Sequence, residues 1–370
     1  MRSAFLRILP VLLCADHALS WGDMGHRAIA YLSQQYMTPE AIRLFDTIIK
    51  PDEKFDISDA AVWADRNKGG IYAYTYNWHF IDARDVVPTH CDVKLNRDCD
   101  FRGECAKHKE PGCVVSAIVN QLSDFTAFTT DSANSSDCPS NLNPDAKQKQ
   151  IAMKFLFHLV GDIHQPLHVE DLGAGGNQIC VKWNGKTANA HEYYTSNPSD
   201  DHSDRFHSCS VTPLKDDDQC PPWEKCKNLH QVWDSLMIEK LLKWDPPSPD
   251  DDPKERKEKA RALRWAGDLS SDGAGNPPLA PSDCVPVGRQ AQACALKWAS
   301  ESNNLICSFV LRDGVAAVKG HELNGTYYNG AVPIIKRQIS RAARRLAAMM
   351  NAIAAVHTDE EDGQQVLQDL

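Results

Sequence analysis

The sequence lacks the features of several common protein classes. No CxxC pair occurs among its thirteen cysteines, which argues against a zinc ribbon or a thioredoxin-like dithiol. No stretch approaches the roughly 20 apolar residues of a membrane-spanning helix, so we expect no membrane anchor. Low-complexity and collagen-like arrays are also missing from its 370 residues, of which 42% are hydrophobic. We therefore expect a globular, enzyme-sized protein with a single domain.

Basic residues are too few to give the chain a general polyanion-binding surface. The formal net charge is -10 at pH 7, which argues against nucleic-acid binding through a broadly basic face. If the substrate is a phosphodiester, the positive charge that holds it must be local. Bound divalent metal ions are the obvious source of that charge.

Residues 1–20 have the pattern of a secretory signal peptide. Two arginines supply a basic start, an apolar run ends at Cys14, and Ala18-Leu19-Ser20 forms a small-residue cleavage site. We expect cleavage before Trp21 and a secreted mature protein. Loss of Cys14 leaves twelve cysteines, an even number that suits disulfide pairing in an oxidising compartment.

Two short motifs match the acceptor sequence for N-glycosylation. They begin at Asn134 (NSS) and at Asn324 (NGT). Both motifs are consistent with the secretory route, so we expect glycosylation at these two asparagines.

Hydrophobic periodicity predicts a mainly α-helical, single-domain bundle with long loops held by disulfides. Helices are predicted over residues 25–36, 39–49, 114–128, 143–165, 229–243 and 335–353. Thr38 is the expected N-cap of the second helix, with Pro39 at its first position. The one convincing β-hairpin is a strand at 178–183 turned by Asn184-Gly185. The domain is expected over 21–356, followed by an acidic, disordered tail at 357–370.

Two HxxxD pairs are the main candidates for metal binding. They are His158 with Asp162 and His230 with Asp234, each within a predicted helix. Four residues make about one helical turn, so each pair presents an imidazole and a carboxylate side by side. That combination suits zinc, which accepts nitrogen and oxygen ligands. A single HxxxD is more often a surface pair or a core histidine.

Further candidate ligands favour the metal interpretation. His168 follows the end of the first HxxxD helix, His79 lies in the aromatic stretch YNWHFID, and Asp65 lies in AVWADRNK. His26 would lie close to the terminal amine that signal cleavage frees on Trp21. An α-amine has a pKa near 8, low enough for a metal ion to displace its proton.

These residues stand in motifs that together resemble the trinuclear zinc nucleases of fungi and plants, which are single-strand nucleases and 3′-nucleotidases. The resemblance covers nearly the whole mature chain. The motifs are WGDMGH (21–26), WAD (63–65), HFID (79–82), FLFHLVGDIHQPLH (155–168), GGN (175–177), NLHQVWD (228–234) and WASESNNLICS (298–308). The resemblance implies a mainly helical domain, similar to zinc phospholipase C, with three zinc ions in a cleft.

The same resemblance implies three ligand sets. Asp65, His79 and His158 would hold one zinc ion. The amine and carbonyl of Trp21, together with His26, would hold a second, and Asp162 would bridge these two ions. The third set would be His168, His230 and Asp234.

Substrate contacts and two disulfides are also implied. Phe80 would stack on a base, Asp82 would hydrogen-bond the base edge, and Lys68 would contact the phosphate. Ala174 and Asn177 would line the substrate site. Stacking contributes on the order of 1 to 3 kcal/mol per base and requires an unstacked base, which favours single strands. The implied disulfides are Cys91 with Cys307 and Cys99 with Cys105.

The chain departs from the compact fungal members in two places. An insertion at about 187–227 contains His191, a rival to His230 as a ligand. We prefer His230, because the residue four positions after His191 is Thr195, which offers no carboxylate. Ala174 stands where compact members have a larger apolar residue beside the base, which puts the base affinity of that position in question.

We therefore expect a secreted zinc endonuclease that cleaves single-stranded DNA and RNA to 5′-phosphorylated products and acts on 3′-nucleotides. Asp65, Asp162 and Lys68 are the expected catalytic residues, with water activated between the two zinc ions that Asp162 bridges. The alternatives are a zinc phospholipase C and a non-enzymatic, disulfide-rich binding protein. The segment GDIH (161–164) suggests a calcineurin-like phosphatase, but no GNH motif accompanies it, and the absence of HExxH disfavours a metalloprotease.

Overall fold

We describe the fold from a computed structural model of the chain. The structure describes residues 21–50, 52, 55–99, 112–125, 145–184, 227–244, 254–273, 276–280 and 283–368. The expected signal peptide, Asn134, Cys105, His191 and all but the last residue of the 187–227 insertion lie outside these residues.

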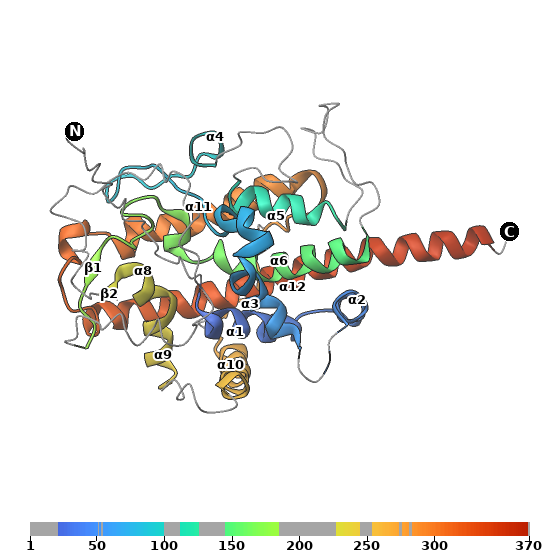
Figure 1. The fold of residues 1–370 in the computed structure, drawn as a ribbon, viewed down its shortest axis with the longest axis horizontal. Helices are drawn as coiled ribbons and strands as arrows, with labels where there is room; N and C mark the ends of the chain where they lie inside the picture. The colour runs from blue at the N-terminus through green and yellow to red at the C-terminus, as the bar shows by residue number, and fades with distance from the viewer. Residues whose placement is uncertain are drawn as a thin grey trace, which may run out of the picture.

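The described residues form a mainly helical fold, as predicted (Figure 1). The α-helices are α1 (Asp23–Gln34), α2 (Pro39–Ile49), α3 (Ile57–Asn67), α4 (Leu95–Asp98), α5 (Val114–Leu122), α6 (Ala146–Asp162), α8 (Leu229–Gln231), α9 (Met237–Leu241), α10 (Lys254–Ser271), α11 (Ala291–Leu305) and α12 (Thr326–Gln368). The 3₁₀ helices are η1 (Gly70–His79), η3 (Pro166–Val169), η6 (Gly288–Gln290) and η8 (Val315–Ala317), and the π-helical turns are η5 (Val232–Leu236) and η7 (Ile306–Val310).

Helix α6 lies in the core of the bundle. It packs against α1, α3, α5 and α12, and α12 runs along the length of the molecule (Figure 1). Every residue from Phe155 to Asp162 is buried. A helix that is buried on all sides should be apolar, so a buried histidine and a buried aspartate within this stretch need partners.

Side-chain caps fix where two of these helices begin. The Thr38 hydroxyl accepts a hydrogen bond from the Ala41 amide (3.2 Å), which confirms the predicted start of α2. Helix α6 begins slightly later than predicted, because Asp145 and Gln148 form a reciprocal capping box at its N-terminus.

Only the first strand of the predicted hairpin can be described, because the residues after Asn184 up to 226 lie outside the described part of the chain. The strand exists as β1 (Cys180–Val181), and Asn184 has the positive φ of 57° that suits a turn. However, β1 pairs antiparallel with β2 (Lys227–Asn228), which lies beyond the insertion. Because β2 leads directly into α8, this pairing is a tertiary contact that local turn residues do not encode.

The C-terminal residues also differ from expectation. We predicted a disordered tail at 357–370, whereas α12 continues through Gln368. Extending an existing helix requires no new nucleus, so polar residues can follow the apolar part of α12 in the same conformation. Among the described residues, no helix is both long enough and apolar enough to cross a membrane.

Three disulfides link the described segments. Cys91 bonds Cys307, as the resemblance implied. Cys99 bonds Cys113 and not Cys105, which corrects the second implied pair. Both partners are buried, and Cys113 is the N-cap residue of α5, whose packing places it 5.3 Å (Cα–Cα) from Cys99. A third disulfide joins Cys284 to Cys294.

A fully buried arginine holds α1 against two neighbouring helices. One terminal nitrogen of Arg27 donates hydrogen bonds to Ser58 Oγ (2.7 Å) and Asp59 Oδ1 (2.8 Å) on α3. The other donates to Glu255 Oε1 on α10 (2.7 Å). The side chain of Arg27 is 0% exposed, so its charge is compensated entirely by these neighbours. The residue before it, His26, is a predicted metal ligand.

We expect Arg27→Met to destabilise the protein by roughly 3 to 5 kcal/mol, because it breaks a buried ion pair and leaves the Asp59 carboxylate with Lys259 as its remaining cationic partner. The control is Arg43→Met, which removes an exposed ion pair with Glu40 (2.7 Å) and should cost about 1 kcal/mol or less. Urea unfolding followed by circular dichroism measures both. Equal losses for the two variants would contradict the role given to Arg27.

Candidate metal centre

The first HxxxD pair lies on α6, in the core of the helical bundle. His158 and Asp162 are both 0% exposed, and His158 Nε2 is 3.2 Å from Asp162 Oδ2. The spacing of one helical turn therefore brings the two side chains together as the sequence predicted.

Asp65 from α3 and His79 from η1 join this pair. His79 Nδ1 lies 3.0 Å from His158 Nε2 and 3.0 Å from Asp162 Oδ2. Asp65 Oδ1 lies 3.6 Å from His79 Nδ1 and 3.5 Å from His158 Nε2. The ligand atoms of Asp65, His79 and His158 lie within 4.8 Å of one another, as a shared cation requires.

His26 from α1 approaches the same helix from the other side of Asp162. Its Nε2 is 3.3 Å from Asp162 Oδ1, whereas Oδ2 faces His79 and His158. The two carboxylate oxygens thus face two different groups of ligands, which is the geometry of a bridging carboxylate. Gly161 leaves room for the His26 ring, because a Cβ at that position would lie 2.6 Å from His26 Cε1.

The second HxxxD pair forms a separate group with His168. His230 Nε2 is 3.1 Å from Asp234 Oδ2 and 3.2 Å from His168 Nε2. We predicted one continuous helix over 229–243, but the chain passes from α8 through the π turn η5 into α9. Single π turns within helices are frequent at functional sites, and Asp234 lies within this one.

Backbone carbonyls fix which nitrogen of three histidines faces the ligand groups. The Nδ1–H groups of His158, His168 and His230 donate to the carbonyl oxygens of Ala61 (2.6 Å), His79 (2.7 Å) and Gly175 (2.7 Å), respectively. A carbonyl only accepts, so Nδ1 carries the proton of each neutral ring and Nε2 presents a lone pair.

The lone pairs of His168 and His230 face each other at 3.2 Å in the protein interior. Two such acceptors repel unless a proton or a metal cation lies between them. Burial disfavours the protonated form and lowers the pKa of His168 to about 4. A divalent cation with nitrogen and oxygen ligands therefore fits this group of residues.

Electrostatics around Asp162 also favour positive charge. Burial alone would lower the pKa of His158, but the Asp162 and Asp65 carboxylates raise it to about 10, so that Nε2 favours a proton or, in its place, a metal cation. Burial alone would raise the pKa of Asp65, yet the Lys68 ammonium and His158 hold it well below its usual range. Lys68 Nζ lies 3.2 Å from Asp65 Oδ1. The carboxylates are therefore ionised and ready to bind a cation.

The predicted base-binding residues lie beside these ligands. The chain from His79 to Ala83 runs next to 168–171, with hydrogen bonds from Ile81 N to His168 O (2.9 Å) and from Asp171 N to Ala83 O (3.2 Å). Phe80 is half-buried, and its ring centroid lies 5.8 Å from that of Tyr76. Burial, followed by the Asp171 charge, raises the pKa of Asp82 to about 7.

Ala174 lies in a left-handed turn that we did not predict from the sequence. Residues 173–176 all have positive φ, including Ala174 at 53°. A non-glycine residue in this region is uncommon and strained. The turn places the Gly175 carbonyl against His230 Nδ1, and the Asn177 side chain donates to the Ala174 carbonyl (2.9 Å). The GGN motif thus orients a ligand, a role that its glycines could have suggested.

His164 lies outside the three ligand groups, as expected for a structural residue. Its Nδ1–H donates to the Val160 carbonyl (2.7 Å), and Arg345 donates to its Nε2 (3.0 Å). Arg345 is itself bound to Glu301 and Asp283.

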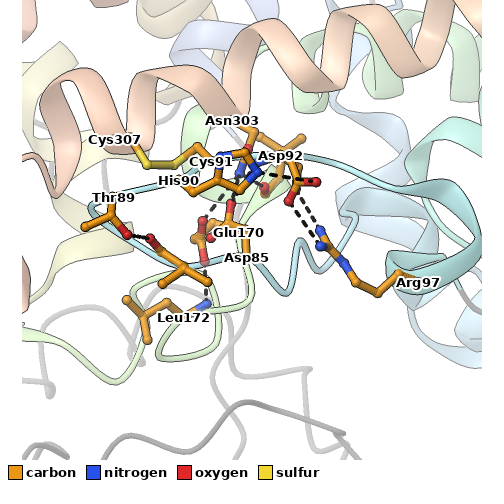
Figure 2. The surroundings of a disulfide bond; sticks show 12 residues. Asp85, Thr89, His90, Cys91, Asp92, Arg97, Glu170, Leu172, Asn303 and Cys307 are labelled. Atoms are coloured by element: carbon orange, nitrogen blue, oxygen red, sulfur yellow. Dashed lines mark hydrogen bonds and ion pairs between the residues drawn. A yellow bond between two sulfur atoms is a disulfide. The ribbon is translucent and has the colours of Figure 1, made fainter.

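The Cys91–Cys307 disulfide lies beside the segment that follows His168 (Figure 2). Asn303, which is fully buried, donates to the Val169 carbonyl (2.9 Å) and to Asp85 Oδ2 (3.1 Å). Glu170 accepts from the Leu172 amide (2.9 Å). These contacts anchor the backbone on one side of the His168 ligand.

Comparisons with known proteins find relatives over nearly the whole chain. A family model described as S1/P1 Nuclease matches residues 21–220 and 219–355. The chain is 29% identical to Nuclease S1 of Aspergillus oryzae, over 94% of this chain and 98% of that protein. It is 28% identical to Nuclease P1 of Penicillium citrinum (90% and 97%) and 32% identical to Endonuclease 2 of Arabidopsis thaliana (93% and 93%).

Removal of bound divalent metal with a chelator should lower the melting temperature by roughly 10 °C, because the facing His168 and His230 lone pairs lose their shared cation. An ion present at a thousand times its dissociation constant contributes about 4 kcal/mol, and 1 kcal/mol shifts the melting temperature of a large domain by roughly 2 to 4 °C. Differential scanning calorimetry measures the change. Added zinc should restore the original value, and an unchanged melting temperature after chelation would contradict the metal interpretation.

Proposed function

Because the chain belongs to the S1/P1 nuclease family, we propose that it is a zinc-dependent phosphodiesterase that hydrolyses nucleic acid. The observation that carries this proposal is the position of Asp162, whose two oxygens face His26 on one side and His79 with His158 on the other. Two cations held by one carboxylate suit in-line displacement at phosphorus.

The three ligand groups account for three zinc ions. Asp65, His79 and His158 would hold one, His26 and Trp21 would hold the second, with Asp162 shared, and His168, His230 and Asp234 would hold the third. The amine of Trp21 becomes a ligand only after cleavage of residues 1–20. Trp21 is fully buried, and the next amide, Gly22 N, donates to the Asp234 carbonyl (3.0 Å), which keeps this end of the chain beside the ligands.

Zinc supplies Lewis acidity, which lowers the pKa of water and offsets phosphate charge. The protein supplies orientation. Asp162 would be shared by two of the cations, one at each carboxylate oxygen. Asp65 holds the Lys68 ammonium 3.2 Å away, where it can bind a phosphate oxygen. No separate protein base is needed for attack by water.

Phe80 and Asp82 favour single-stranded substrates. A base can lie on the half-buried Phe80 ring only when it is unstacked from its neighbours. We infer that the enzyme cleaves single-stranded DNA and RNA to 5′-phosphorylated products. It should also remove phosphate from 3′-nucleotides, since one base beside Phe80 and Asp82 and one phosphate beside Lys68 are enough to make these contacts.

We also infer that the enzyme is secreted. The signal-like residues 1–20 and the need for a free Trp21 amine support export. Three disulfides among the described residues are consistent with an oxidising compartment. Asn324, two residues before α12, is the described candidate for glycosylation.

Asp162→Asn should lower the rate of single-stranded oligonucleotide cleavage at least about 1,000-fold, because it removes the charge shared by two cations while keeping the side-chain volume. Asp313→Asn, which changes an exposed carboxylate beside Arg312, is the control and should stay within about twofold of the parent. Initial rates with 5′-labelled oligonucleotide measure both. Near-parental cleavage by a folded Asp162→Asn protein would refute the proposed function.

Base recognition should depend on the ionisation of Asp82. Its pKa near 7 means that the side chain changes from a neutral carboxyl to a carboxylate acceptor as the pH rises through this value. Guanine offers N–H donors, so the KM for guanosine 3′-phosphate should fall roughly fivefold across this range, the gain expected for a charge-assisted hydrogen bond.

The matched variant for this experiment is Asp82→Asn, which cannot ionise. Its KM for the same nucleotide should lack the fivefold change near pH 7 and keep only the dependence that ionisation of the substrate phosphate, with a pKa of about 6, gives to both proteins. Phe80→Ala should raise KM at every pH by loss of stacking. A parallel pH dependence in Asp82→Asn and the parent enzyme would assign the titration to another group.

A further inference from the structure

Gln165 lies midway between two predicted ligands, three residues after Asp162 and three before His168. Its side chain is 0% exposed, which is unusual for a glutamine and requires that its polar atoms be satisfied. The backbone ties it to both neighbours, because Gln165 N donates to Asp162 O (2.9 Å) and His168 N donates to Gln165 O (3.0 Å).

The amide nitrogen of Gln165 orients the carboxylate of Asp234. Gln165 Nε2 donates to Asp234 Oδ1 at 2.6 Å. The other oxygen, Oδ2, lies 3.1 Å from His230 Nε2. A carboxylate held through one oxygen has its second oxygen fixed in direction, so Gln165 determines where Oδ2 points within the group.

The amide oxygen of Gln165 acts on a second member of the same group. Gln165 Oε1 accepts from the Leu167 amide at 2.6 Å, which makes Gln165 the N-cap of η3, the short helix that carries His168. One buried carboxamide therefore contacts both the Asp234 carboxylate and the helix that carries His168. These two ligands come from segments far apart in the sequence.

We propose that Gln165 is a positioning residue that sets the affinity of the His168, His230 and Asp234 group for its metal ion. Outer hydrogen-bond partners of metal ligands typically change metal affinity by 10- to 100-fold when they are removed. The inference rests on the proposed zinc sites and not on any substrate. It concerns one ion of three, because within the described residues the Gln165 side chain hydrogen-bonds Asp234 and the Leu167 amide and none of Asp65, His79 and His26.

The test compares zinc binding by the full mature chain and three variants. Gln165→Met keeps the length of the side chain but removes both hydrogen bonds, and Gln165→Asn keeps the amide but shortens its reach. The control is Gln338→Met, which removes a buried amide that donates to the His164 carbonyl (2.8 Å) and to Ser302 Oγ (3.1 Å) and not to a ligand side chain.

Zinc content is measured by elemental mass spectrometry after dialysis, and affinity by competition with a chromogenic chelator. We expect three zinc ions in the parent and in Gln338→Met. In both Gln165 variants one ion should bind 10- to 100-fold more weakly while two stay unchanged. Circular dichroism melts of the metal-free proteins show whether Gln165→Asn, the milder variant, is folded.

Two results would overturn the inference alone. One is three ions of parental affinity in Gln165→Met, and the other is an equal loss in Gln165→Met and Gln338→Met, which would indicate general packing. A parent protein that binds no zinc would instead overturn the proposed function, and the inference with it.

Discussion

The structure depends on one constraint, the need to compensate histidine and aspartate side chains that are buried together in the middle of a helical bundle. Helix α6 carries His158 and Asp162 at positions where a core helix is otherwise apolar. Three other segments supply His26, His79 and Asp65. The two histidines face the Asp162 carboxylate, and Asp65 faces His158. The ion pairs that result hold α1, α3, η1 and α6 together, so the candidate metal centre is also part of the core.

Backbone geometry fixes the orientation of the candidate ligand side chains. Three carbonyls set the ring orientation of His158, His168 and His230. The Gly175 carbonyl reaches His230 only because the chain turns through residues of positive φ. Gly161 makes space for His26, and Arg27, the next residue, fixes α1 against α3 and α10. Rigid supports of this kind keep ligand atoms in place before a cation binds.

The clustering of the candidate ligands could be predicted from the sequence, because its strongest signals are local. The spacing of each HxxxD pair follows helical geometry, and the helices themselves follow apolar periodicity and caps such as Thr38. The motifs that resemble the zinc nucleases supplied Asp65, His79 and His168, which the structure brings beside the two pairs.

The features that were missed depend on tertiary contacts. Cys99 pairs with Cys113 because α5 packs beside it, and β1 pairs with a strand beyond the insertion. The carbonyl partners of the histidines and the contacts of Gln165 also join segments far apart in sequence. The helical continuation to Gln368 follows from propagation of α12, which composition alone did not reveal.

The central claim is that these buried groups hold metal ions, and anomalous X-ray diffraction at the zinc absorption edge tests it most directly. Crystals of the mature protein should give three anomalous peaks: two on either side of Asp162, and one between His168, His230 and Asp234. Absence of anomalous density at these positions in zinc-supplied crystals would contradict the account.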